Sequence, residues 1–139
     1  MATKSKTPTI GYLARPKLSP IPNSDKWELA ESWHVALRGV WFVIPEGYKT
    51  DGASIPRFLW RVCGHPFSGV RIIPALVHDA LYDDLIPCDD RKVADRIYRD
   101  GLIEQGFPRW KARLEYAALR LFGGSHWRGD DLALDLTDD

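Results

Sequence analysis

The segment ALVHDALYDD, residues 75–84, places an imidazole next to a carboxylate at His78 and Asp79, within an apolar stretch. Side chains four residues apart share one face of a helix, so Tyr82 should lie beside His78. Asp79 should project about 100° around the same helix, toward the side that it shares with Asp83. One helix would therefore carry functional groups in two directions.

Asp95 is the expected partner of His78. It stands among apolar residues of the next predicted helix, a position that suggests a partner across a helix interface. The link between the two helices, residues 85–89, is short, which predicts an antiparallel pair and brings Asp95 toward His78. A carboxylate on one ring nitrogen fixes the tautomer of a histidine and raises its basicity. The other nitrogen can then take a proton from water or bind a metal.

Other interpretations of these residues stay open. A histidine paired with an aspartate at a helix interface is often a satisfied buried polar group without chemistry. Arg91, four residues before Asp95, could also pair with this carboxylate. A transition-metal site made from His78, Asp79 and Asp95 would need more ligands than the motif offers.

The order of residue types predicts an α+β fold in a single domain, 1–139, with a small N-terminal antiparallel β-sheet followed by a helical half. Residues 1–25 contain four prolines, which predict extended chain without regular strand pairing. Residues 26–45 are rich in aromatic and β-branched residues and should form strands. Residues 56–123 have helical periodicity, and the acidic segment 129–139 should be a solvated or partner-bound tail.

Glycine, proline and aspartate mark where the elements should end. Arg38-Gly39 predicts a tight turn between two strands. Helices are expected over about 74–84, 89–106 and 108–123, as proline or aspartate opens each of these segments and glycine ends the second and third. The apolar residues of the third helix predict a buried face formed by Trp110, Leu114, Ala117, Ala118, Leu121 and Phe122.

Composition excludes several classes of protein. The chain has 139 residues and is 45% hydrophobic, enough to bury one core. Its 19 Lys and Arg residues balance its 19 Asp and Glu residues, so no nucleic-acid partner is indicated. The first residues, MATKSKTPTI, lack the apolar core of a signal peptide, and no apolar run of about 18 residues occurs. Neither a signal peptide nor a transmembrane segment is expected.

Four ordered blocks resemble a family of phage and prophage proteins catalogued as a domain of unknown function. The blocks are IPEGYKTDGASIPRFLW, ALVHDALYDD, KVADRIYRDGL and LRLFGGSHW, and the resemblance covers about residues 27–127. It implies a viral origin and a gene placed among late, virion or lysis genes. Synthesis in the host cytoplasm, with the virion as a further location, follows from that resemblance.

The order DG-x-S, HD-x-x-Y and AD-x-x-[FY] is also similar to the bacterial and viral forms of phospholipase A2. These forms include the domain that parvoviruses use to breach membranes. In this chain the three motifs begin at Asp51, His78 and Ala94. The resemblance implies that His78 is a general base that activates water and that Asp95 orients it. Tyr82 would belong to the supporting hydrogen-bond network.

The same resemblance implies a calcium site. Asp79 would be a Ca²⁺ ligand, and the backbone around Asp51 and Gly52 would complete the calcium loop. The sequence departs from the secreted enzymes in three respects. Their glycine-rich calcium loop is absent, no cysteine braces the segment ALVHDALY, and a β-rich region precedes the motif.

These patterns predict a phage-encoded, small hydrolase-like protein, most concretely a calcium-dependent phospholipase-like ester hydrolase that acts on phospholipid or at a membrane surface. The alternative is a non-enzymatic virion, tail or assembly component, with other phage structural proteins as partners, in which the His/Asp pair is structural. The catalytic interpretation requires an imidazole nitrogen of His78 within about 3.2 Å of a carboxylate oxygen of Asp95. It also requires residues 51–54 to fold back toward Asp79.

Overall fold

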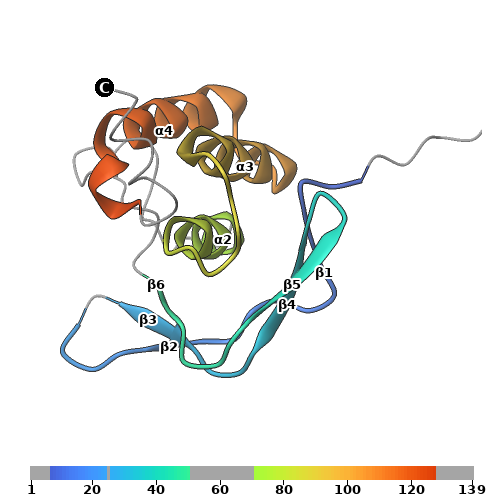
Figure 1. The fold of residues 1–139 in the computed structure, drawn as a ribbon, viewed down its shortest axis with the longest axis vertical. Coiled ribbons are helices and arrows are strands. Elements are labelled where there is room, and N and C mark those ends of the chain that lie inside the picture. Colours follow the sequence, from blue (N-terminus) through green and yellow to red (C-terminus); the bar gives the residue numbers. More distant parts are fainter. Residues whose placement is uncertain (1–6, 25, 51–70, 128–139) are drawn as a thin grey trace, which may run out of the picture.

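The structure, a computed structural model, describes residues 7–24, 26–50 and 71–127. It has the predicted α+β architecture, with strands in the N-terminal part and helices after them (Figure 1). The strands form two small antiparallel sheets instead of one. The first sheet has the order β1 (Ile10–Tyr12), β4 (Trp33–Leu37), β5 (Val40–Ile44), and the second has the order β2 (Leu18–Pro20), β3 (Trp27–Leu29), β6 (Lys49–Thr50).

The hairpin of β4 and β5 is closed by the predicted turn. Leu37 and Val40 are partners on either side of it. Arg38 and Gly39 both have positive φ, 50° and 89°, as a two-residue turn of the primed type requires. The alternation along β4 and β5 directs Val35 and Ile44 into the core, where both are fully buried.

The expectation that residues 1–25 lack strand pairing is wrong. β1 pairs with β4, placing Ile10 opposite Leu37, and β2 pairs with β3, placing Leu18 opposite Leu29. The prolines are compatible with this pairing because they lie outside β1 and, in the case of Pro20, at the end of a short strand. A missing N–H group there costs no central ladder bond.

The helices agree closely with the predicted segments: α2 is Ile72–Tyr82, α3 is Arg91–Glu104 and α4 is Arg109–Phe122, followed by the short 3₁₀ helix η2, Gly124–His126. The side chain of Asp90 caps α3 by accepting a hydrogen bond from the backbone N–H of Lys92 at 2.9 Å. Gly106 has a φ of 97° after α3. Among the described residues, no helix combines the length and the apolar character that are needed to cross a membrane.

The buried face of α4 differs from the predicted one. Its buried residues are Ala112, Glu115, Ala118 and Leu119, whereas Trp110 and Leu121 are exposed. Of the predicted face, Trp110, Ala117, Leu121 and Phe122 are exposed, Leu114 is half-buried and only Ala118 is buried. Compared with the prediction, α4 is rotated about its own axis, because Glu115 points inward to a buried arginine, as described below. A polar contact therefore sets the orientation of α4.

Helix α2 lies between the strands and the other two helices (Figure 1). All its residues from Ile73 to Tyr82 are buried. The contacts with α3 run from Pro74 near Gly101, through His78 at Asp95, to Tyr82 at Arg91. This order defines an antiparallel pair, as the short link predicts.

Candidate functional site

The His78–Asp95 contact exists in the structure. Nε2 of His78 lies 2.8 Å from Oδ1 of Asp95, across the interface of α2 and α3. His78 is 1% exposed and Asp95 is completely buried. The prediction that these two residues meet is confirmed, and the pair is enclosed within the helical part of the molecule.

Asp95 of α3 accepts hydrogen bonds from side chains of two other helices. Tyr82 of α2 donates its hydroxyl hydrogen to Oδ1 at 2.6 Å, and Arg120 of α4 donates to Oδ2 at 2.8 Å. Arg91 forms the predicted i,i+4 ion pair with the same carboxylate, at 3.8 Å from Oδ2. Its hydrogen bonds go to the Tyr82 hydroxyl and to backbone carbonyls near the end of α4. Asp95 therefore holds α2, α3 and α4 together while it binds His78.

The hydrogen-bond donors around Asp95 determine its protonation state. Burial alone would raise the pKa of this carboxyl group, but the hydrogen bonds from His78, Tyr82 and Arg120 and the charge of His78 outweigh burial and lower the pKa below its ordinary value. The group is therefore a carboxylate at neutral pH, and Nε2 of His78 must donate its hydrogen to it. The second ring nitrogen, Nδ1, is then the one that would exchange a proton in catalysis.

Asp95 should make the protein sensitive to acid. A lowered pKa in the folded state means that Asp95 contributes stability above its unfolded pKa of about 3.9, and that this contribution is lost as the pH falls through the lower folded pKa. We expect the free energy of unfolding, measured by urea titration at a series of pH values, to fall below about pH 4. In Asp95→Asn this decrease in the free energy of unfolding below about pH 4 should be missing.

Asp100 provides the matched control for that measurement. Its carboxylate accepts a hydrogen bond from its neighbour Arg99 at the surface, and both side chains are partly exposed. Asp100→Asn should keep the wild-type slope, since exposed pairs contribute little. An unchanged slope in Asp95→Asn would contradict the assignment of the acid response to Asp95.

Two tyrosine rings enclose the imidazole. The ring centroid of Tyr82 lies 4.1 Å from that of His78, and the ring centroid of Tyr98 lies 5.3 Å from it. The far side of Tyr82 meets Trp127 edge-on, with ring centroids 5.4 Å apart. These rings fix the orientation of His78, because a side chain held by packing on two sides has few alternative rotamers.

Asp79 faces the second sheet. Its Oδ2 accepts a hydrogen bond from the hydroxyl of Thr50, the last residue of β6. Asp83, the residue directly after α2, accepts a hydrogen bond from the Tyr48 hydroxyl at 2.6 Å. Asp51 and Gly52, the other predicted calcium residues, lie outside the described residues, as do residues 51–54 as a whole. Thr50, the residue directly before that segment, contacts Asp79.

The oxygen ligands of the described residues alone do not form a calcium site. Calcium takes about six to eight oxygen ligands. Here the described residues offer the Asp79 carboxylate and the Thr50 hydroxyl, which are bonded to each other. No group of three or more His, Cys, Asp or Glu side chains suited to a metal occurs in the ranges 7–24, 26–50 and 71–127. A calcium ion at Asp79 would need ligands from residues 51–70 or from water.

A second buried polar cluster lies beside the first and was not predicted. Arg71, at the start of α2, forms an ion pair with Glu115 of α4, and both side chains are fully buried. Tyr98 donates its hydroxyl hydrogen to the same carboxylate at 2.6 Å. Because the Tyr98 ring also contacts His78, the two clusters are continuous. One sequence signal could have indicated this: Glu115 is spaced three and four residues from Ala112 and Leu119, which places it on a face with apolar residues.

Burial perturbs the tyrosines of both clusters. Burial, followed by the Asp95 carboxylate, raises the pKa of Tyr82. Burial and the charge of Glu115 raise the pKa of Tyr98. Both hydroxyls therefore stay protonated and act as hydrogen-bond donors at neutral pH.

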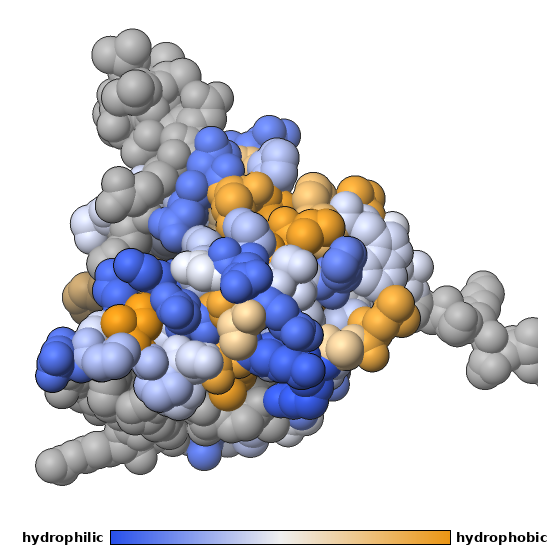
Figure 2. All heavy atoms as spheres, turned by 90° about the horizontal axis from the view of Figure 1, so that it is seen from below, coloured by the Kyte–Doolittle hydropathy of each residue, from blue (hydrophilic) through white to orange (hydrophobic). Residues whose placement is uncertain are grey.

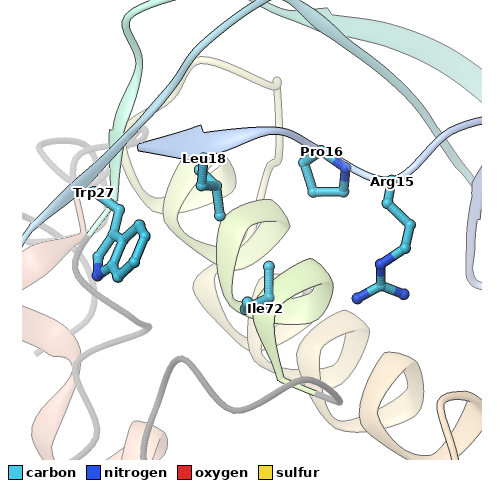
Figure 3. Close-up of a pocket in the computed structure, with 5 residues that line it drawn as sticks. All are labelled: Arg15, Pro16, Leu18, Trp27 and Ile72. Atoms are coloured by element: carbon cyan, nitrogen blue, oxygen red, sulfur yellow. The ribbon is translucent and has the colours of Figure 1, made fainter. Parts of the chain in front are cut away.

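An apolar cavity of about 250 Å³ lies on a different face of α2. Figure 3 shows its lining: Arg15, Pro16 and Leu18 from the N-terminal segment, Trp27 of β3 and Ile72 of α2. Ile72 precedes His78 by six residues, so the two side chains project about 120° apart around the helix. The cavity is therefore separate from the His78–Asp95 pair.

Comparison with known proteins gives a family and two relatives. A family model described as protein of unknown function, DUF1353, matches residues 27–119. The uncharacterized protein y4jT of Sinorhizobium fredii (strain NBRC 101917 / NGR234) is 32% identical over 89 residues, which are 61% of this chain and 25% of the relative. The uncharacterized protein y4iH of the same strain is 33% identical over 100 residues, 72% of this chain and 41% of the relative. The chain thus spans less than half the length of these curated relatives. No solved structure matches it.

Proposed function

The chain belongs to the DUF1353 family of proteins of unknown function, and from the geometry of its buried site we propose that it is an ester hydrolase that uses His78 as a general base. The observation that carries this proposal is the 2.8 Å contact of His78 Nε2 with Asp95 Oδ1, together with the Tyr82 hydroxyl on the same oxygen. These are the three residues that the resemblance to phospholipase A2 assigns to catalysis. Asp95 fixes the tautomer, and Tyr82 fixes Asp95.

The proposed reaction uses Nδ1, the ring nitrogen of His78 that does not face Asp95. Nδ1 of His78 takes a proton from a water molecule as the water oxygen attacks the ester carbonyl carbon. The bond from that carbon to the alcohol oxygen then breaks. The proton passes from Nδ1 to the departing alcohol oxygen, so that a carboxylic acid and an alcohol leave. Since His78 is 1% exposed, the proposal requires the water to bind in an enclosed position.

Asp79 would supply the electrostatic part of the reaction. In the proposal it holds Ca²⁺ with the help of Asp51 and Gly52, and such an ion would stabilise negative charge on the carbonyl oxygen. Asp79 follows His78 directly in α2, is 9% exposed and accepts a hydrogen bond from Thr50 at the end of β6. Phospholipid is the proposed substrate, and a membrane surface the proposed place of action. We further propose that the protein is phage-encoded and is synthesised in the host cytoplasm.

Released fatty acid tests this function directly. Purified protein incubated with mixed phosphatidylcholine and phosphatidylglycerol vesicles should release fatty acid in the presence of calcium, and release should stop with chelator. Asp79→Asn should require more calcium for the same rate, because one charged ligand is lost. Asp100→Asn, which changes a surface carboxylate on α3, should behave as the wild type. Absence of release with calcium, magnesium, manganese or zinc would refute the proposal.

A second function is favoured by a different observation. The Arg120 guanidinium from α4 occupies the other oxygen of Asp95, and Arg91 ties Tyr82 to α4. A carboxylate of one helix with donors from two others is what a purely structural tie would have. The alternative proposal is therefore a non-enzymatic virion, tail or assembly component of a phage, with other phage structural proteins as partners. Loss of stability in His78 variants of a protein without hydrolytic activity would support it.

A further inference from the structure

Helix α4 turns an apolar stripe toward the solvent. Trp110 and Leu121 are 60% and 76% exposed, Ala117 is exposed and Leu114 is half-buried. Their spacing of four, three and four residues lines them up along one face of the helix. The buried residues of α4 centre on the opposite face. The helix is therefore apolar on its outer side as well as on the side that faces the core.

Basic side chains flank this stripe. At 100° per residue, Arg109 and Arg113 lie on one side of it and Lys111 on the other. The ammonium group of Lys111 lies 5.5 Å from the ring centroid of Trp110. None of these three cations forms an ion pair with a described residue. The acidic residue of α4, Glu115, is buried, so the outer side of the helix carries only positive charge.

The position of α4 leaves its outer side facing away from the strands (Figure 1). The strand-bearing side also exposes hydrophobic residues, with hydrophilic ones between them (Figure 2). On β5, Val40, Trp41 and Val43 are exposed, but that strand has no charged residue. Exposed apolar side chains and flanking cations occur together on α4.

We propose that the outer side of α4 docks on a lipid surface that contains anionic headgroups, such as those of phosphatidylglycerol. Trp110, Leu114 and Leu121 would lie between the headgroups and the acyl chains, as the apolar side of an interfacial helix does. Tryptophan is enriched at this level of a membrane. The long basic side chains on both flanks would reach the phosphates, and each cation strengthens binding to an anionic surface.

A second copy of this chain fits the same surface less well. Contact between two α4 helices would bring their cations together, because the helix has no exposed carboxylate to face them. Like charges across an interface oppose association. An anionic lipid surface supplies the negative charge that the outer side of α4 lacks.

The orientation of the docked protein bears on the proposed hydrolysis, and this part of the inference rests on that proposed function. The inner side of α4 reaches the His78–Asp95 pair through Arg120, which donates to Asp95. A helix with its side chains is about 10–12 Å across. Docking would therefore place the pair about one helix diameter from the lipid that provides the proposed substrate.

Co-sedimentation of the full chain with vesicles tests the docking, in the presence of chelator so that binding is measured without hydrolysis. The wild type should bind vesicles that contain phosphatidylglycerol better than vesicles of pure phosphatidylcholine, and added salt should weaken binding. Leu121→Glu should weaken it more than about tenfold, since it removes an inserted apolar side chain and adds a repelled charge. Arg113→Gln should weaken it about fivefold, the effect of one cation at an anionic surface.

Two matched controls lie outside α4. Leu13→Glu introduces the same charge at an apolar residue that is 90% exposed, directly after β1. Lys26→Gln removes an exposed cation directly before β3. Both variants should bind vesicles as the wild type does, and circular dichroism checks that every variant is folded.

Several results would overturn the proposal. These are no binding by the wild type, equal binding to both kinds of vesicle, wild-type binding by Leu121→Glu, or an equal loss in the two controls. A wild-type dimer that becomes a monomer in Leu121→Glu, measured by sedimentation velocity, would assign the surface to a second copy instead.

Addition of calcium separates this proposal from the proposed hydrolase. Binding without fatty-acid release would refute the hydrolase and keep the docking surface. Release at the wild-type rate by Leu121→Glu would keep the hydrolase and refute the docking surface.

Discussion

Replacement of His78 by glutamine should reduce the hydrolysis of phospholipid about 10²–10⁴-fold, the usual effect of losing a general base. Glutamine has a similar volume and can still donate a hydrogen bond to Asp95 from its amide group. It therefore keeps the packing between Tyr82 and Tyr98 while removing the basic nitrogen. Fatty-acid release from vesicles is the measurement, with the melting temperature taken on the same samples.

Two further variants separate chemistry from structure. Asp95→Asn should lower the rate because its amide no longer stabilises the charge that His78 acquires. Tyr82→Phe should have a smaller effect, since it removes one hydrogen bond and keeps the ring. His34 is an exposed histidine of β4, and His34→Gln should leave the rate unchanged. If His78→Gln retains the wild-type rate, the general base is not His78.

The contact at the centre of this prediction could be derived from the sequence because it depends on local geometry. The helical period places His78 and Tyr82 on one face, and the short link to α3 brings Asp95 opposite them. Chain reversal between neighbouring helices leaves few other arrangements. The pair and its tyrosine were therefore predictable from fewer than 25 consecutive residues.

The contribution of α4 could not be derived in this way. Its sequence offers two stripes, one with Trp110 and Leu121 and another with Ala112, Glu115 and Leu119. Hydrophobicity alone favours the first stripe, yet the second is buried. The choice depends on Arg71, which is 44 residues away from Glu115. Since the pattern of one helix contains no information about a buried charge on another, Arg120 was missed as a partner of Asp95.

The strand pairing of the N-terminal segment was missed for a similar reason. Ile10 meets Leu37 and Leu18 meets Leu29, and these pairings are specified by partners rather than by the short strands themselves. Three-residue strands with prolines nearby have weak intrinsic preference for a sheet. These short strands form because residues such as Ile10 are buried against the helices.

Removal of the Glu115 carboxylate should lower the free energy of unfolding by about 3–5 kcal/mol, the usual cost of leaving one partner of a buried ion pair uncompensated. Arg71 is completely buried, and its Nε and Nη1 already lack hydrogen-bond partners among the described residues. In Glu115→Leu the guanidinium would lose its counter-charge, and the Tyr98 hydroxyl would lose its acceptor. Urea unfolding followed by circular dichroism measures the loss.

The double variant Arg71→Met with Glu115→Leu separates the cost of an uncompensated buried charge from the contribution of the ion pair itself. Replacement of both partners by apolar side chains of similar size removes the uncompensated charge, so much of the stability lost in Glu115→Leu should return. Glu31→Leu serves as the control, because Glu31 forms an exposed ion pair with Lys17 at 3.7 Å and should contribute less than about 1 kcal/mol. A double variant as unstable as the sum of the two single variants would mean that Arg71 and Glu115 stabilise α4 through separate contacts, and the rotation of α4 would then need another cause.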